Sequence, residues 1–401
     1  MTTALLLENP DALADEIFLE NGIEVIRVSS GMDEDELIDA LQGVQILGIR
    51  SHTQVTRRVL EACPELLAVG AFCIGTNQID KEAAAEHGVA VFNAPYSNTR
   101  SVVELAIAEI IMMGRRLMDR TNSLHDGVWN KSATHSHEVR GRTLGIVGYG
   151  SNGSQLSVLA EALGMKVIFY DIAERLALGN AQRMETLDDL LREADVVSLH
   201  VSGEPANTNL FGDREFALMR PRSLFINLSR GFIVDIEALK EHLLTGHIAG
   251  AAVDVFPTEP KANGDLFESP LRGIDNVILT PHIGGSTIEA QQNIGKFVSG
   301  KLVEYLNTGR TGMSVNLPNL QLPVSSNAKH RLALVHQNIP GVMAEVNHSL
   351  AEHDVNVVGQ ALKTDGEIGY AVTDIAGDLP REILDELANR ETTIRLRYLT
   401  V

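Results

Sequence analysis

Residues 143–164 read "TLGIVGYGSNGSQLSVLAEALG" and contain the pattern that decides the fold. A short apolar run leads into Gly148, Gly150 and Gly153, spaced as G-x-G-x-x-G, and a segment with helical spacing follows. In such a unit the first glycine permits a tight turn, the second lets the backbone approach a pyrophosphate, and the third lets helix pack on strand. The helix N-terminus then offers free N–H groups to phosphate. The stretch therefore predicts a dinucleotide-binding βαβ unit.

An acidic residue, Asp171, ends the next apolar run, "KVIFYD" at 166–171. A carboxylate in this place hydrogen-bonds the adenosine ribose hydroxyls and repels a 2′-phosphate, so NAD is expected rather than NADP. Ser151 and Asn152 open the helix after the glycine turn. Asn152 stands where a side chain usually faces the helix–sheet seam, and we expect it to contact phosphate or solvent.

Two series of short apolar runs predict two parallel sheets. Residues 1–97 alternate such runs with helical segments, which is typical of βαβ units. The second series is continuous in its apolar character, as expected for strands buried on both faces, and its runs are 143–150, 166–171, 196–201, 223–229, 248–256 and 276–283. Between the two series, residues 101–118 are apolar over more than half of a helix circumference. They predict one helix buried from two sides, often by a second subunit.

The C-terminal part has a different pattern. Residues 314–328 are rich in proline, serine and asparagine without periodicity, so a linker is predicted there. Residues 329–401 then give the order β-α-β-β-α-β, a ferredoxin-like unit. This unit holds no cluster of residues that could do chemistry, and it is expected to bind or regulate.

Composition limits the classes of function. A chain of 401 residues predicts more than one domain, and a formal net charge of -20 argues against nucleic acid or an anionic membrane as a main partner. Neither a signal peptide nor an apolar run of about 20 residues is found. Cys63 and Cys73, the two cysteines, lack metal-type spacing. A cytoplasmic protein with reduced thiols and no metal site is expected.

Three candidate catalytic residues each follow an apolar run of the second series: Arg230, Glu259 and His282. Carboxyl ends of parallel strands share one edge, where open α/β sheets place their sites. An imidazole exchanges a proton near neutral pH, and a carboxylate bonded to it would orient the ring and raise its pKa. A guanidinium can bind a substrate carboxylate at two points. Together they predict hydride transfer to or from a hydroxy acid.

The motifs "FCIGTNQID" (72–80), "NLSRGFIVD" (227–235), "AAVDVFPTEP" (251–260) and "LTPHIGGST" (279–287) resemble those of the D-2-hydroxyacid dehydrogenases. The similarity is strongest to members that oxidise D-3-phosphoglycerate to 3-phosphooxypyruvate at the start of L-serine biosynthesis, and it covers essentially the whole chain. It implies a Rossmann-type NAD domain inserted in a discontinuous flavodoxin-like substrate domain, with a cleft between them, and a C-terminal ACT domain. The implied parts are the substrate domain (1–97 and 286–316), the NAD domain (98–285), a linker (317–328) and the ACT domain (329–401).

The resemblance also implies the residues of each site. The catalytic set is Arg230, Glu259 and His282. The implied NAD contacts are Gly148, Gly150, Ser151, Asn152, Gly153, Asp171, Leu228, Ser229, Arg230, Asp254, His282, Gly284 and Gly285. The implied substrate contacts are Arg50, Ser51, Gly75, Asn98 and Lys131, the last reaching in from a neighbouring subunit. An L-serine effector, bridging two ACT domains of a homotetramer, would contact His336, Asn338 and Asn356.

Two alternatives stay open. His52 stands where similar chains carry a second arginine, and a histidine is a weaker phosphate partner above a pKa near 6.5. The same site could therefore serve another 2-hydroxy acid, such as 2-hydroxyglutarate, glycerate or lactate, with 2-oxoglutarate reduced as a side reaction. A non-enzymatic NAD(H)-sensing protein, like the corepressors built on this fold, is the alternative from a different class.

Overall fold

The computed structural model describes residues 2–260 and 264–401. The chain forms two compact units, Met1–Pro95 with Gln291–Val401, and Tyr96–Ala290. Within the described residues, no helix has the length and apolar character needed to cross a membrane. The α/β fold class predicted from the sequence, with two parallel sheets and a C-terminal antiparallel ferredoxin-like unit, is confirmed.

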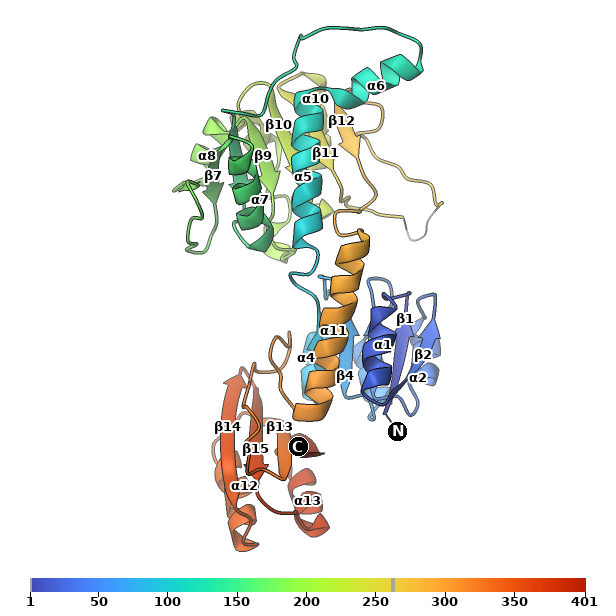
Figure 1. The fold of residues 1–401 in the computed structure, drawn as a ribbon, viewed down its shortest axis with the longest axis vertical. Coiled ribbons are helices and arrows are strands. Elements are labelled where there is room, and N and C mark those ends of the chain that lie inside the picture. The colour runs from blue at the N-terminus through green and yellow to red at the C-terminus, as the bar shows by residue number, and fades with distance from the viewer. Residues whose placement is uncertain (1, 261–263) are drawn as a thin grey trace. The chain divides into compact units, whose positions relative to one another are not determined.

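The unit Tyr96–Ala290 is built on a seven-stranded parallel sheet of order β12-β11-β10-β9-β6-β7-β8 (Figure 1). Its strands are β6 (Thr143–Val147), β7 (Lys166–Tyr170), β8 (Gln182–Arg183), β9 (Val196–Leu199), β10 (Ser223–Asn227), β11 (Ile248–Val253) and β12 (Val277–Leu279). Chain order reverses between β6 and β9, and open α/β sheets bind ligands beside such a reversal, at the carboxyl ends of the strands.

Helices cover both faces of this sheet. They are α5 (Thr99–Gly114), α7 (Ser151–Ala162), α8 (Leu187–Glu193), α9 (Asp213–Leu218) and α10 (Ile236–Leu244). Helix α6 (Leu117–His125) follows α5 and has no buried residue. Successive strand residues alternate between two cores: Ile146 packs with Leu156 and Val102 beneath α5 and α7, whereas Val147 packs with Leu190 and Phe216 beneath α8 and α9. Since both faces are buried, the strands read as unbroken apolar runs, as the sequence indicated.

The single helix predicted over residues 101–118 is wrong in its extent. Helix α5 ends at Gly114, Arg116 has a left-handed backbone with φ of 50°, and α6 begins at Leu117. Asp119 fixes the break, because its carboxylate accepts from Arg116 Nε at 2.7 Å and from the backbone N–H of Asn276 at 3.1 Å. The inner face of α5 is buried as expected, but Ile111 on its outer face is exposed in the single chain.

The first unit contains a five-stranded parallel sheet of order β2-β1-β3-β4-β5, the flavodoxin-like arrangement. The strands are β1 (Thr2–Leu7), β2 (Ile23–Val28), β3 (Ile46–Ile49), β4 (Ala68–Ala71) and β5 (Ala90–Phe92). The helices are α1 (Leu13–Glu20), α2 (Glu34–Ala40), α3 (Arg57–Ala62), α4 (Lys81–Glu86) and α11 (Ile288–Thr308). One face of the sheet packs under α2, α3 and α4, and the other packs under α1 and α11.

The same unit ends in a four-stranded antiparallel sheet of order β14-β15-β13-β16. Its elements are β13 (His330–Gln337), α12 (Val342–Glu352), β14 (Val357–Asp365), β15 (Ile368–Ile375), α13 (Arg381–Ala388) and β16 (Thr393–Thr400). One face carries α12 and α13 over Leu332 and Leu334. On the other face, Ala333 and Tyr370 join the same core as Leu302 of α11 and Phe92 of the first sheet.

The stretch predicted as a linker, 317–328, contains no helix or strand, but it is packed rather than free. Leu317 and Leu320 are buried in the shared core. Just before them, Asn316 bonds the backbone of β5, donating to Val89 O at 2.8 Å and accepting from Val91 N at 2.8 Å. A sequence without periodicity therefore describes an irregular segment and not a flexible one.

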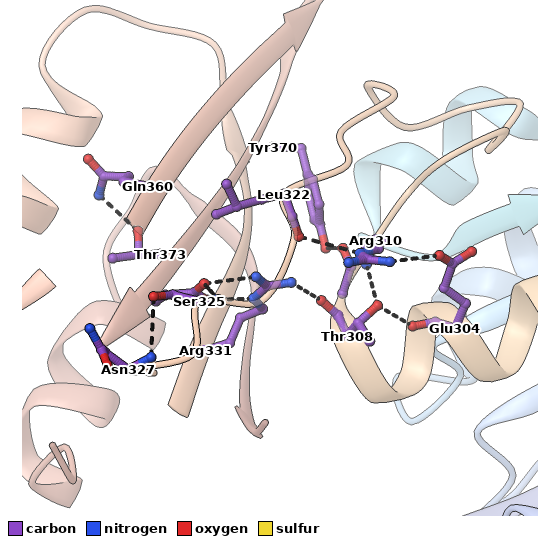
Figure 2. Close-up of polar contacts among 12 residues, drawn as sticks. Glu304, Thr308, Arg310, Leu322, Ser325, Asn327, Arg331, Gln360, Tyr370 and Thr373 are labelled. Atoms are coloured by element: carbon purple, nitrogen blue, oxygen red, sulfur yellow. Dashed lines mark hydrogen bonds and ion pairs between the residues drawn. The ribbon is translucent and has the colours of Figure 1, made fainter. Parts of the chain in front are cut away.

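Cationic side chains join the antiparallel sheet to the end of α11. Fully buried Arg331 pairs with Asp374 through two bonds of 2.6 and 2.9 Å and donates a third to Thr308 O at 2.9 Å (Figure 2). Arg397 donates to the carbonyl oxygens of Tyr305 and Leu306 at 3.1 and 2.6 Å. These carbonyls belong to the last turn of α11, where Tyr305 O also accepts from Gly309 N at 2.8 Å. The end of a helix has negative dipole character, so cations stabilise this turn.

Candidate active site

The glycine turn has the geometry that close backbone packing requires. Gly148 has a φ of 91°, and a Cβ there would lie 2.6 Å from His200 O. A Cβ on Gly153 would lie 2.2 Å from Gly148 O, so this glycine allows α7 to pack on the turn. A Cβ on Gly150 would meet nothing within 4 Å, which leaves that surface of the turn open to a ligand.

Helix α7 begins at Ser151 with no side-chain cap, so the N–H groups of its first turn are available to an anion. Asn152 is partly exposed, and Gly153 instead occupies the helix–sheet seam. A depression of about 490 Å³ opens beside this turn. Its lining residues are Tyr96, Tyr149, Gly150, Ser151, Ser154, Arg175, Leu176 and Leu178. An open backbone, an uncapped helix start and adjoining space fit the pyrophosphate of a dinucleotide.

Asp171 lies at the end of β7, 8% exposed. Its carboxylate accepts from the N–H groups of Tyr149 and Ala173, each at 2.8 Å, which ties it to the glycine turn. Arg175 approaches it at 3.5 Å and is half-exposed. Arg175 was not among the residues predicted from the sequence, although its place four residues after Asp171 could have indicated it.

The carboxyl end of β11 holds the loop that carries His282. Asp254, 2% exposed, accepts from Thr280 Oγ1 at 2.6 Å and from the N–H groups of Ile283 and Gly284 at 2.8 Å each. His282 itself has a left-handed φ of 54°, an uncommon conformation for a residue with a side chain. Such backbone strain persists where surrounding hydrogen bonds impose it, and it is common at functional sites.

Glu259 and His282 are brought together, with Glu259 Oε2 and His282 Nδ1 2.9 Å apart. The other carboxylate oxygen accepts from Phe256 N–H at 3.1 Å, which fixes the orientation of Glu259. The hydrogen bond to the Glu259 carboxylate raises the pKa of His282 above its ordinary value, although partial burial of the ring acts to lower that pKa. Burial pushes the pKa of Glu259 up, but the bonds from His282 and Phe256 outweigh it and leave that pKa lowered. The pair can hold a proton on Nδ1 and exchange one at Nε2.

Arg230 follows β10 at the same edge of the sheet. Its Nη1 donates to Ser229 O at 2.7 Å, and Asn227 braces the turn, donating to Arg230 O at 3.1 Å and accepting from Ser229 N at 3.0 Å. Leu228 and Ser229 are buried there. A Cβ on Gly231 would lie 1.9 Å from the carbonyl carbon of Phe256, so only glycine lets this turn contact the chain leading to Glu259. Asn227, which the sequence analysis did not single out, is a structural brace of the turn.

The residues predicted to bind substrate lie in both units. Arg50 and Ser51 follow β3, and Gly75 follows β4, at the carboxyl edge of the five-stranded sheet. Asn98 precedes α5, and its amide nitrogen would lie 2.3 Å from a Cβ on Gly285, next to the His282 loop. Lys131 is exposed in an irregular segment, and its side chain makes no hydrogen bond or ion pair with any residue that the structure describes. Within residues 2–260 and 264–401, no group of three histidine, cysteine or acidic side chains is arranged to hold a metal.

Comparisons with known proteins show which family the chain belongs to. Residues 107–284 match the family described as D-isomer specific 2-hydroxyacid dehydrogenase, NAD binding domain, and residues 332–395 match the AHAS small subunit-like ACT domain. The chain is 50% identical to D-3-phosphoglycerate dehydrogenase of Haemophilus influenzae, over 92% of this chain and 90% of that one. It is 48% identical to the Escherichia coli (strain K12) enzyme of the same name, over 98% and 97% of the two chains.

A solved structure, NAD-dependent formate dehydrogenase from Staphylococcus aureus in complex with NAD, is 25% identical with a TM-score of 0.65, covering 76% of this chain and 96% of that one. The chain belongs to the D-isomer-specific 2-hydroxyacid dehydrogenases, in the branch that contains the D-3-phosphoglycerate dehydrogenases. It is an oxidoreductase, and the predicted cofactor, NAD, is confirmed.

Changing Asp171 to asparagine is expected to lower the preference for NADH over NADPH by about 10- to 100-fold, the effect of losing a hydrogen bond to a charged group. The carboxylate would otherwise repel a 2′-phosphate. The ratio of kcat/KM with NADH to kcat/KM with NADPH measures this preference. Asp188→Asn makes the same chemical change at a carboxylate paired with Arg214 at 2.7 Å, and it should leave the ratio unchanged. An unaltered ratio in Asp171→Asn contradicts the assigned role.

Changing Glu259 to glutamine is expected to reduce kcat by roughly tenfold or more, because His282, the predicted proton-transfer residue, loses the carboxylate that orients its ring. It also lowers the pKa of His282, since the bond from the Glu259 carboxylate is what raises it. Oxidation needs the neutral ring, so its rate rises with pH through this pKa, and that rise moves to lower pH. Reduction needs the protonated ring, so the rate of reduction falls as the pH rises through this pKa. That fall also moves to lower pH. A pH profile of kcat that does not move argues against the pair.

Proposed function

We propose that this protein catalyses the NAD-dependent oxidation of D-3-phosphoglycerate to 3-phosphooxypyruvate, the first step of L-serine biosynthesis. The observation that carries the proposal is the Glu259–His282 pair, in a chain about half identical to D-3-phosphoglycerate dehydrogenases over nearly its whole length. The alternative of an NAD(H)-sensing corepressor has no structural observation in its favour.

In the proposed mechanism, His282 Nε2 accepts the proton of the substrate hydroxyl while Glu259 stabilises the resulting imidazolium. NAD, held at the glycine turn and Asp171, would supply the acceptor for the hydride of the carbon that carries this hydroxyl. Arg230 binds the substrate carboxylate and the oxygen on which charge develops, and a fixed guanidinium there lowers the barrier by electrostatic complementarity. In reduction, protonated His282 returns the proton to the carbonyl oxygen.

For the rest of the substrate, we propose that Arg50, Ser51 and Gly75 bind the phosphate group, with Asn98 and with Lys131 of a neighbouring subunit. The NAD contacts follow the family pattern, including Leu228, Ser229, Asp254, Gly284 and Gly285. We also propose the division into a substrate domain of 1–97 and 286–316, an NAD domain of 98–285, a linker of 317–328 and a regulatory domain of 329–401. Among the described residues neither Cys63 nor Cys73 is in a disulfide, which suits a reducing cytoplasm.

The antiparallel unit supports a regulatory role with L-serine as effector. His336 is buried, its Nδ1 lies 2.8 Å from Gln337 O, and among the described residues its buried Nε2 has no hydrogen-bond partner. If Nδ1–H donates to that carbonyl, Nε2 is an acceptor suited to an ammonium group. Asn338, next in the same turn, supplies an amide, and its Nδ2 donates to Gly366 O at 2.9 Å.

The topology of the sheet separates the third effector residue from the first two. His336 pairs with Gly369, and Gly369 pairs with Thr364, so His336 is level with the end of β14. Asn356 precedes the start of β14, so it lies about 25 Å away along the strand at ~3.3 Å per residue. One serine molecule could therefore contact all three only if Asn356 came from a second chain. Edge strand β14, with Val357 and Leu362 exposed, offers a surface for such pairing in a homotetramer.

The deciding experiment is NADH oxidation with 3-phosphooxypyruvate, with and without millimolar L-serine, and with 2-oxoglutarate for comparison. Rapid turnover suppressed by serine supports both the reaction and the effector. Rapid turnover indifferent to serine removes the effector alone. Turnover with 2-oxoglutarate only would overturn the substrate and favour the second candidate, for which the exposed His52 in place of an arginine is the relevant observation.

A further inference from the structure

Glu8 has an unusual position at the end of β1. It is 8% exposed, although it is a carboxylate, and it has a left-handed φ of 65°. Asn9, the next residue, has a φ of 52°. Two consecutive residues with side chains in this region are uncommon, and such strain persists only where the surroundings impose it.

The carboxylate of Glu8 binds three successive backbone amides of the loop after β3. Its Oε2 accepts from Ser51 N at 2.9 Å and from His52 N at 3.0 Å, and its Oε1 accepts from Thr53 N at 2.8 Å. Successive N–H groups that converge in this way form a typical anion-binding concavity. Here the anion is a side chain of the protein itself. Burial acts to raise the pKa of Glu8, but hydrogen bonds from the Thr53 hydroxyl and from the three backbone amides outweigh it and leave that pKa below its usual value.

The preceding residue of the same loop is fixed from a different element. Gln78, also buried, donates from Nε2 to Arg50 O, and Cys73 Sγ lies 3.4 Å from the same carbonyl. The backbone from Arg50 to Thr53 is thus bonded at every residue, whereas the side chains of Arg50 and Ser51 are left to project from it. A loop held in this way needs no ordering when a ligand binds, which favours affinity.

We infer that Glu8 is a positioning residue that holds the Arg50–Thr53 loop in its substrate-binding conformation and occupies its amide concavity, so that this loop binds an anionic substrate group through its side chains. The inference rests on the proposed function, which assigns the substrate phosphate to Arg50 and Ser51. It follows that selectivity for a phosphorylated acid depends on a carboxylate that does not contact the substrate. A purely structural Glu8 would affect the amount of folded protein but not this selectivity.

The test is Glu8→Gln in the full-length protein. Glutamine has the same shape, but its NH2 group would face an amide N–H, so at least one acceptor bond is lost. We expect KM for 3-phosphooxypyruvate to rise about tenfold or more, with little change in kcat or in KM for NADH. The ratio of kcat/KM for 3-phosphooxypyruvate to that for hydroxypyruvate should fall by a similar factor, and this ratio is independent of the folded fraction.

Asp11→Asn is the matched control, because that carboxylate also accepts from a backbone N–H, Leu13 at 3.0 Å, but lies outside the loop. It should leave both quantities unchanged. If Glu8→Gln gives too little protein, Gln78→Leu tests the other attachment of the loop by the same ratio. A wild-type ratio in the variants, or a fall in kcat alone, overturns the inference. A wild-type protein inactive with 3-phosphooxypyruvate instead overturns the proposed function.

Discussion

Replacing His282 with alanine is expected to lower kcat by roughly 10²- to 10⁴-fold in both directions, the usual contribution of a positioned general acid–base residue. The variant loses the group that we propose accepts the substrate proton, together with the partner of Glu259. Most of the NADH affinity should persist, because His282 is only one of the predicted NAD contacts and the glycine turn and Asp171 do not depend on this ring. Turnover with 3-phosphooxypyruvate and a fluorescence titration with NADH measure the two effects separately.

The chain offers a close control in the same unit. His242 also lies beside a carboxylate, with its Nε2 2.9 Å from Asp213 Oδ1, but it belongs to α10. His242→Ala should leave kcat unchanged. Retention of full activity in His282→Ala would remove this residue from the mechanism, and loss of NADH binding would indicate a structural role instead.

Replacing Asp374 with alanine is expected to destabilise the C-terminal sheet by about 3–5 kcal/mol, since it leaves the buried charge of Arg331 without its partner. Both side chains are fully buried, and Asp374 also accepts from Ser325 N at 3.1 Å. Hydrogen exchange of the amides of β13 measures the effect in the full-length protein. Exchange there should become faster, while exchange in β6 of the other unit stays unchanged.

Asp378 provides the contrast, because it pairs with Lys329 and His330 at the surface and is 72% exposed. Asp378→Ala should change the stability by no more than about 1 kcal/mol. The double change Arg331→Met with Asp374→Leu should recover much of the loss, because it removes both buried charges. Equal effects of Asp374→Ala and Asp378→Ala would contradict the importance of burial.

The glycine turn was predictable because its requirements are local. A φ of 91° at Gly148 and the close approach of Gly153 to the turn follow from a few neighbouring residues, and these leave a readable pattern. The strands were predictable because burial on both faces requires continuous apolar runs. Arg230, Glu259 and His282 were visible as polar residues after such runs, since parallel strands share one carboxyl edge.

The end of α5 was not predictable in the same way. Apolar spacing continues past Gly114, and the break depends on Asp119, which bonds Asn276 from a distant part of the sequence. Similarly, nothing in the irregular composition of 317–328 shows that Leu317 and Leu320 enter a core shared by two sheets. Contacts between residues far apart in the chain leave no local periodicity.

By itself, the sequence determined the order of the elements, the two parallel sheets, the ferredoxin-like unit, the glycine turn and the residue types of the site. Periodicity and turn chemistry depend on residues close together in the chain, so they can be predicted from one sequence. Only the tertiary structure decided that Glu8 fills the amide concavity of the Arg50–Thr53 loop and that Arg331 is buried against Asp374 and the end of α11. The type of a charged residue does not show whether it lies in solvent or in a core. Its burial is favourable only where partners in the folded structure satisfy the charge.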